Sequence, residues 1–248
     1  MRPALLAALF SMALTAHLVA QGGTVSVQVA DGFDFPVRKP DAEGCYKARG
    51  LRFPNHPGED WNTAPGDGDI GEPVYSIGHG VVVLARDVRM GWGNLLIVRH
   101  SYVENGTCQT IDSVYAHLNE IKVREGQQVN KGELIGTIGN CRGLYDAHLH
   151  FEIRKNLAIG MNRSSFARNT TNYFDPSSFI RAHRSLPTGP GHSTVAINTF
   201  TAPGSNNEAR GGTMSFPVDA SQTSESTPSK VIIRRGSFRV NRYDDLDL

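Results

Sequence analysis

The sequence predicts an all-β fold, an antiparallel β-sheet sandwich or open barrel with one short helix near its C-terminal end. Between about residues 33 and 183, short runs that are β-branched or that alternate polar and apolar residues are separated by Gly, Asn and Asp. Such runs are typical of strands joined by turns. The strands are expected within residues 73–88, 94–100, 112–118, 133–139 and 148–154.

The one helix is expected in the stretch FDPSSFIRAHR. Asp175 is a natural N-cap, because its side chain can accept a hydrogen bond from a main-chain N–H of the first turn. Pro176 suits the first helical position, where its missing N–H has no intrahelical partner to lose. We therefore expect a helix that begins at this proline.

The chain of 248 residues is long enough for one sizeable domain and additional segments. Residues 1–20 combine one early cation, Arg2, with an apolar run that ends in small residues, which is the pattern of a signal peptide cleaved after Ala20. The alternative is an N-terminal membrane anchor, but polar residues interrupt the run and make it marginal as a spanning helix. We expect a secreted or periplasmic protein of the cell envelope, with no stable membrane anchor after cleavage.

The composition changes after the predicted domain, which we place at residues 21–184. Residues 185–248 are rich in Gly, Ser, Thr and Pro. This composition is typical of a linker or a loosely ordered extension. Within it, residues 230–243 could form one hairpin.

Three cysteines fall within the predicted domain: Cys45, Cys108 and Cys141. For an exported protein the simplest expectation is one disulfide and one free thiol. Three pairings are possible, and the spacing does not choose among them.

The charges nearly balance, with 25 Lys and Arg against 24 Asp and Glu and a formal net charge of +1. Because no basic block stands out, nucleic acid is not an expected partner. The sequence makes no prediction of the oligomeric state.

Two histidines lie two positions apart in the alternating stretch DAHLHFEIRK. In a strand, His148 and His150 would point to one face and Leu149 and Phe151 to the other. The two imidazoles would stand roughly 6–7 Å apart along the strand. An isolated pair of this kind is most often a polar, solvent-facing stripe, so a functional interpretation requires partner residues.

The stretch NHPGEDW offers two of these partners, His56 and Asp60. Pro57 and Gly58 between them exclude a regular helix, which predicts a loop or a strand edge. Their even spacing along an extended segment would place both side chains on one side.

The stretch YAHL offers a third partner, His117, at the end of a predicted strand. There the alternation predicts that Ser113, Tyr115 and His117 share one face. Taken alone, His117 could be no more than a polar group on an edge strand.

Zinc chemistry explains why these residue types would gather. Catalytic zinc takes three protein ligands from His and carboxylate groups and keeps a fourth position open. Two histidines and one aspartate meet that count and leave two histidines for proton transfer, to which imidazole is suited by its pKa near 6.5.

The combined pattern H-x-x-x-D, Y-A-H-L and H-L-H-F-E closely resembles the lysostaphin-type, LytM-like zinc endopeptidases of bacterial cell walls. The resemblance runs from about FDFPV (33–37) through FDPSSFI (174–180) and includes GWGNLLIVRH (91–100) and VREGQQVNKGELIGTIG (123–139). It implies the LytM-like fold, a duplicated hybrid motif, and a secreted zinc endopeptidase that hydrolyses peptide cross-bridges of peptidoglycan.

Carried over by residue, the resemblance implies one Zn²⁺ ion held by His56, Asp60 and His150. His117 and His148 match the two catalytic histidines of the family, which would orient the nucleophile, stabilise the oxyanion and protonate the leaving amine. Within the His148–His150 pair, geometry alone would allow the reverse assignment.

Two other functions are compatible with the same sequence. Some members of this family have lost ligands and act as non-catalytic activators of other wall hydrolases, but all five motif residues are present here, which favours activity. A wall-binding module, with residues 185–248 as the adhesive part, is the third reading.

Three features depart from the usual pattern of the family and bear on substrate preference: the cysteines, residues 102–110 and the CYKARGLRFPN approach to His56. His79 and His100 match no motif position and are expected to be surface or strand histidines.

Overall fold

The fold described here is that of a computed structural model, which describes residues 23–89, 91–187 and 191–201. The predicted signal peptide and the predicted hairpin at 230–243 lie outside these residues. Along the chain the elements are β1 (Thr24–Gln28), β2 (Tyr46–Arg49), β3 (Glu59–Asn62), β4 (Pro73–Tyr75), β5 (Gly80–Asp87), β6 (Asn94–Glu104), β7 (Thr107–Leu118), β8 (Glu120–Ile121), β9 (Gln128–Val129), β10 (Leu134–Thr137), β11 (Leu149–Arg154), the 3₁₀ turn η1 (Arg163–Ser165), β12 (Tyr173–Phe174), α1 (Pro176–Ala182) and β13 (His192–Ala196).

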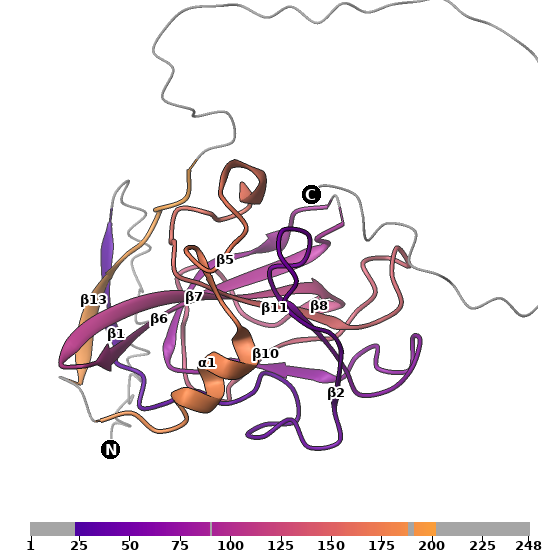
Figure 1. The fold of residues 1–248 in the computed structure, drawn as a ribbon, viewed down its shortest axis with the longest axis horizontal. Coiled ribbons are helices and arrows are strands. Elements are labelled where there is room, and N and C mark those ends of the chain that lie inside the picture. Colours follow the sequence, from indigo (N-terminus) through magenta and orange to yellow (C-terminus); the bar gives the residue numbers. More distant parts are fainter. Residues whose placement is uncertain (1–22, 90, 188–190, 202–248) are drawn as a thin grey trace, which may run out of the picture.

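Within the described residues the strands form three antiparallel sheets (Figure 1). The large, eight-stranded sheet has the order β2-β3-β11-β7-β6-β5-β9, and β12 pairs with β11. A second sheet has the order β4-β10-β8, and β1 pairs with β13 in a third. The predicted all-β, antiparallel fold is confirmed.

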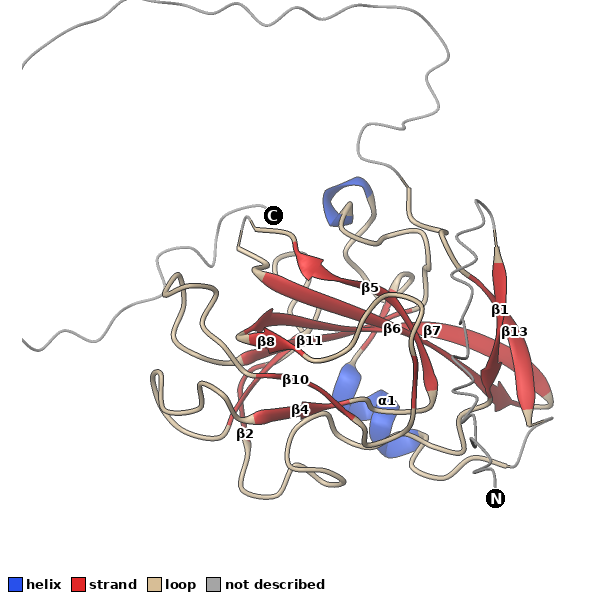
Figure 2. Cartoon of the chain, turned by 180° about the vertical axis from the view of Figure 1, so that it is seen from behind, coloured by secondary structure: helices blue, strands red, loops and turns tan. Residues whose placement is uncertain are grey.

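The main hydrophobic core lies between one face of the large sheet, the β4-β10-β8 sheet and helix α1 (Figure 2). Leu149, Phe151 and Ile153 of β11 all enter it, as their alternation predicted. The opposite face of the sheet carries a smaller apolar cluster around Trp92, to which Phe200 is added from beyond β13. His150 and Arg154 of β11 lie against Trp92 on this face.

The predicted helix is confirmed. It begins at Pro176, and the Asp175 side chain accepts a hydrogen bond of 2.9 Å from the main-chain N–H of Ser178. The same end of the helix is attached to β3, because Ser177 Oγ donates to the buried Glu59 carboxylate at 2.7 Å. Among the described residues, no helix has the length and apolar character needed to cross a membrane.

Residues 102–110, which depart from the usual pattern of the family, form the end of a long hairpin. Strands β6 and β7 pair as far as Glu104 and Thr107, with Asn105 and Gly106 both at positive φ in the turn. An Asn-Gly pair is the preferred sequence for a two-residue hairpin turn of this kind.

The expected disulfide is wrong, because all three cysteines are free. Cys108 is exposed near the tip of the β6–β7 hairpin, where it pairs with Val103. Cys141 is buried beside Gly93, and Cys45 precedes β2 at the edge of the main core. The three thiols belong to separate parts of the fold.

Strand β13 lies in the stretch that was predicted to be an extension. It pairs with β1 over five positions, from Thr24 with Ala196 to Gln28 with His192. Arg99 of β6 also donates to the main-chain oxygen of Ala196 at 2.5 Å. The domain division at residue 184 stays a prediction, but part of the chain beyond it packs onto the sheet.

Candidate metal centre

Strands β3 and β11 bring two of the candidate ligands together. Asp60 and His150 are directly opposite each other in the antiparallel register, which places their side chains on the same face of the sheet. His56 precedes β3 in a tight loop closed by two main-chain hydrogen bonds of 2.7 Å between Arg52 and His56. Segments about 90 residues apart in sequence thus meet at one point.

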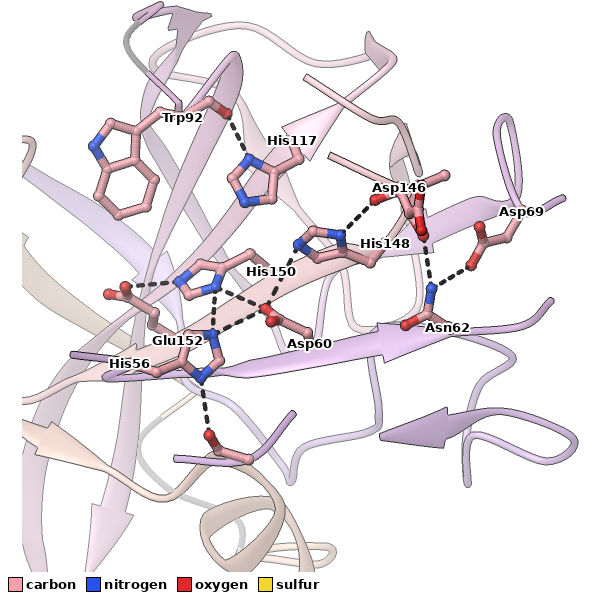
Figure 3. Close-up of polar contacts among 12 residues, drawn as sticks. His56, Asp60, Asn62, Asp69, Trp92, His117, Asp146, His148, His150 and Glu152 are labelled. Carbon is pink, nitrogen blue, oxygen red and sulfur yellow. Dashed lines mark hydrogen bonds and ion pairs between the residues drawn. The ribbon is translucent and has the colours of Figure 1, made fainter. Parts of the chain in front are cut away.

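Three atoms of these residues form a compact triangle (Figure 3). Asp60 Oδ1 lies 3.0 Å from His56 Nε2 and 3.0 Å from His150 Nδ1, and the two nitrogens are 3.1 Å apart. Tetrahedral zinc with bonds of 2.0–2.1 Å separates its ligand atoms by about 3.3 Å. The spacing therefore fits a small divalent cation with only slight adjustment.

The ring protons of both histidines point away from the triangle. The main-chain oxygen of Gly50 lies 2.8 Å from His56 Nδ1, and a carbonyl can only accept, so Nδ1 carries the proton. His150 Nε2 lies 2.9 Å from the Glu152 carboxylate, which places its proton on Nε2 in the same way. Two nitrogen lone pairs and a carboxylate oxygen then face one another with no hydrogen between them, an arrangement that attracts a cation.

The pKa shifts of Asp60 and His150 also indicate that the triangle attracts a positive charge. Burial would raise the pKa of Asp60, but the adjacent His150 and His56 rings, which attract a shared proton, outweigh it and hold the pKa well below its usual value. Burial would lower the pKa of His150, yet the carboxylates of Asp60 and Glu152 raise it. Without a metal, a proton is therefore drawn to the same position.

His148 and His117 lie beside the triangle. His148 Nδ1 donates to the main-chain oxygen of Asp146 at 2.7 Å, and its Nε2 lies 3.7 Å from Asp60 Oδ1. His117 Nδ1 donates to the main-chain oxygen of Trp92 at 3.3 Å. The His117 ring centre is 4.8 Å from that of His148 and 5.6 Å from that of His150. Each of these two rings therefore carries its proton on Nδ1 and has a free lone pair on Nε2.

His117 does not share a face with Tyr115 as predicted. Tyr115 points into the main core, but His117 has a φ of 62° and contacts the His148 and His150 rings. Asn94 pairs with Leu118 and Leu96 with Tyr115, so β7 holds one extra residue there, a β-bulge. A bulge redirects the side chain that follows it, and histidine tolerates positive φ better than most residues.

Two glycines permit the close approach of these segments. A Cβ on Gly58 would lie 2.6 Å from the Phe151 oxygen and 3.1 Å from His150 Cε1. A Cβ on Gly139 would lie 2.5 Å from both the His117 oxygen and the Asn119 nitrogen. Both positions exclude a side chain. The sequence marked Gly58 only as a helix breaker and did not mark Gly139, because the clash depends on residues that are distant along the chain.

Other residues support the site without having been predicted to do so. Glu152 lies on the same face of β11 as His150, is fully buried and bonds His150. The Tyr145 ring centre lies 4.7 Å from that of His117. His100, in contrast, is fully buried away from the triangle and bonds Ser113 and the main chain of His79.

Comparison with known proteins adds an independent finding. The model of Peptidase family M23 matches residues 54–162, which include all five candidate residues. Peptidoglycan DD-endopeptidase ShyA of Vibrio cholerae is 38% identical over 84 residues, 34% of this chain and 18% of that protein. Murein hydrolase activator NlpD of Escherichia coli is 37% identical over 87 residues, 35% of this chain and 21% of that protein.

The matched segment is thus about a fifth of the length of these two relatives. Lipoprotein NlpD of Yersinia enterocolitica is 36% identical over 87 residues, and here the match covers 35% of this chain and 81% of that protein. With this coverage, and with the family model matching the residues that build the triangle, the chain belongs to peptidase family M23.

Proposed function

We propose that the protein is a zinc-dependent endopeptidase that hydrolyses peptide cross-bridges of peptidoglycan. The observation that carries the proposal is the convergence of three proton-free ligand atoms, on His56, Asp60 and His150, beside two histidines with a free Nε2. Family membership and the name of the ShyA relative support this reading.

Zinc is the proposed cofactor, as one ion held by His56 Nε2, Asp60 Oδ1 and His150 Nδ1. When bound, zinc supplies Lewis acidity, which lowers the pKa of water and polarises a peptide carbonyl. The donor set suits zinc, because two neutral imidazoles and one carboxylate are common ligands of catalytic zinc.

His117 and His148 are the proposed catalytic residues. Burial, together with the nearby His148 and His150, lowers the pKa of His117 well below its usual value, so this ring is neutral at pH 7. A neutral ring whose Nδ1 proton is committed to a main-chain oxygen can accept a proton at Nε2. Either ring can therefore take the proton that the attacking water loses and pass it to the leaving amine.

We further propose that residues 1–20 are a signal peptide and that the protein works in the cell envelope, where its substrate lies. The names of the relatives, which include a lipoprotein and a peptidoglycan endopeptidase, support this location. The peptide of peptidoglycan is the one proposed partner.

The direct test is digestion of purified peptidoglycan by the chain without residues 1–20, followed by mass spectrometry of the released muropeptides. We expect new amino termini at one type of cross-bridge bond, loss of release with a chelator, and recovery with zinc. The same preparation with His150→Ala is the control and should release nothing.

The same experiment separates the alternatives. A non-catalytic activator would release no peptide alone but would increase release by an added wall hydrolase. A wall-binding module would sediment with insoluble wall material and release nothing under either condition. Either result with zinc-loaded protein would contradict the proposal.

A further inference from the structure

Glu152 is a buried carboxylate that contacts the candidate metal centre from behind. It lies two residues after His150 in β11, on the same face of the sheet, and is completely buried. Its Oε1 accepts from His150 Nε2 at 2.9 Å and from Arg163 Nη1 at 2.8 Å, while its Oε2 accepts from Arg154 Nε at 2.7 Å. Both oxygens are thus held in place by positively charged or N–H groups.

We infer that Glu152 is a positioning residue of the metal centre, which keeps the proton of His150 on Nε2 and so presents Nδ1 to the metal. The inference rests on the proposed function, since it requires a metal at the triangle. A neutral imidazole carries a single ring proton, and an acceptor at one nitrogen determines which nitrogen carries it. If that acceptor is lost, the proton can move to Nδ1 and occupy the position of the metal.

The two candidate histidine ligands differ in what supports them. The proton of His56 is held by the main-chain oxygen of Gly50, which no side-chain substitution removes. The proton of His150 is held by a side chain, so its support can be altered by substitution. Position 152 is therefore where the preference of the site for a metal can be tuned without changing a ligand.

The carboxylate is also connected to the other half of the site. The Arg163 guanidinium lies over the Trp92 ring, 4.6 Å from its centre. The main-chain oxygen of Trp92 accepts from both the main-chain N–H and Nδ1 of His117. A change at Glu152 should reach His150 directly, and His117 only through Arg163 and Trp92.

An isosteric amide cannot replace this carboxylate. Three donors converge on Glu152, from His150, Arg154 and Arg163, and they use both of its oxygens. Glutamine has one oxygen and one NH₂ group, so at least one of the three donors would face another donor. Glu152→Gln therefore breaks at least one of the three bonds that fix the acceptor of His150, with no change in volume.

Glu59 provides a matched control. It is also completely buried, and it directly precedes the candidate ligand Asp60 in β3. Its side chain lies on the opposite face of the sheet, where it accepts from Lys47 Nζ at 2.8 Å, Trp61 Nε1 at 3.0 Å and Ser177 Oγ at 2.7 Å. Glu59→Gln thus removes a buried charge next to the site without touching a histidine.

The test measures zinc affinity by competition with a chromogenic chelator, on folded samples of the chain without residues 1–20. We expect Glu152→Gln to bind zinc roughly 10- to 100-fold more weakly than the wild type, the usual effect of losing such a supporting contact. Glu59→Gln should stay within about twofold of the wild type, since its contacts bear on folding alone. Equal affinity of Glu152→Gln and wild type, or equal weakening in both variants, would overturn the inference.

A second measurement needs no variant and cannot be confused with a folding defect. Nitrogen-15 NMR of the histidine rings in the zinc-loaded wild type reports which nitrogen of each ring carries the proton. We expect the proton of His150 on Nε2, and a proton on Nδ1 would refute the inference. If the wild type binds no zinc at all, the proposed function itself fails, which is a different result from either of these.

Discussion

Two buried histidines, His100 and His150, have opposite electrostatic surroundings. His100 Nδ1 lies 2.9 Å from the His79 oxygen, and its Nε2 lies 2.7 Å from Ser113 Oγ, which is in turn 3.0 Å from the Tyr115 hydroxyl. Each acceptor there has a donor. Burial lowers the pKa of His100 from 6.5 to about 4, whereas the two neighbouring carboxylates raise that of His150.

The difference shows what distinguishes a structural histidine from a candidate ligand. Burial is common to both, and both belong to strands of the same sheet. At His100, hydroxyl and carbonyl groups satisfy the ring, and nothing further is required. At His150, a second imidazole nitrogen and a carboxylate oxygen converge on Nδ1, and a cation, either a shared proton or a metal ion, completes the arrangement.

The largest effect is expected from His150→Ala, which removes one corner of the triangle. Bound zinc should fall from one ion per chain to none, and turnover of peptidoglycan should be lost with it, because two ligands rarely retain catalytic zinc. Metal analysis and muropeptide release measure both. His100→Gln is the paired control and should keep zinc and activity. Zinc retained by His150→Ala would show that His150 is not a required ligand.

His117→Ala should separate metal binding from catalysis. The ring is beside the triangle but not part of it, so zinc content should remain at one ion per chain. Turnover should fall by roughly 10²- to 10⁴-fold, the range for loss of a positioned acid or base. Full activity of this variant on peptidoglycan would show that His117 is not catalytic.

Gly139→Ala tests the packing that places His117. The added Cβ would lie 2.5 Å from the His117 oxygen, and a shift of about 1 Å in a catalytic group can cost about 10²-fold in rate. We expect reduced turnover with zinc retained. Unchanged kinetics would mean that the bulge tolerates displacement, and a crystal structure of the variant would show where the chain moved.

The smallest effect is expected on stability, from His100→Gln. The unfolded chain binds a proton at this residue near pH 6.5, whereas the folded protein does so only near pH 4, so the folded state loses stability as the pH falls from about 6.5 to about 4. At about 1.4 kcal/mol per pKa unit, the loss approaches about 3 kcal/mol. Urea denaturation of metal-free wild type and variant at several pH values should show a free energy of unfolding that depends less on pH in the variant. The same pH dependence in both proteins would contradict the lowered pKa of His100.

Much of the fold and part of the site could be predicted from local pattern. The alternation in β11 identified which residues enter the core, and Asp175 with Pro176 marked the start of the helix. The meeting of His56, Asp60 and His150 followed from a family resemblance, and the structure brings them together. Their roles as ligands stay predictions.

What could not be predicted depends on contacts between distant segments. The bulge that turns His117 toward His150 has no signal in the alternation of β7, because one extra residue inverts the pattern only at that point. The burial of Glu152 has no local signal either, because it depends on ion pairs with Arg154 and with Arg163, which lies beyond the strand. The need for glycine at position 139 likewise arises from the strand that crosses it.

The pairing of β1 with β13 has a practical consequence for both ends of the protein. Because the strands are antiparallel and the Ile197 N–H donates to the Gly23 oxygen at 2.9 Å, the start of β1 and the end of β13 lie side by side. A new amino terminus created after Ala20 would start within three residues of Gly23. Removing residues 185–248 would leave β1 without its hydrogen-bonding neighbour, so a shortened protein should retain the chain through residue 201.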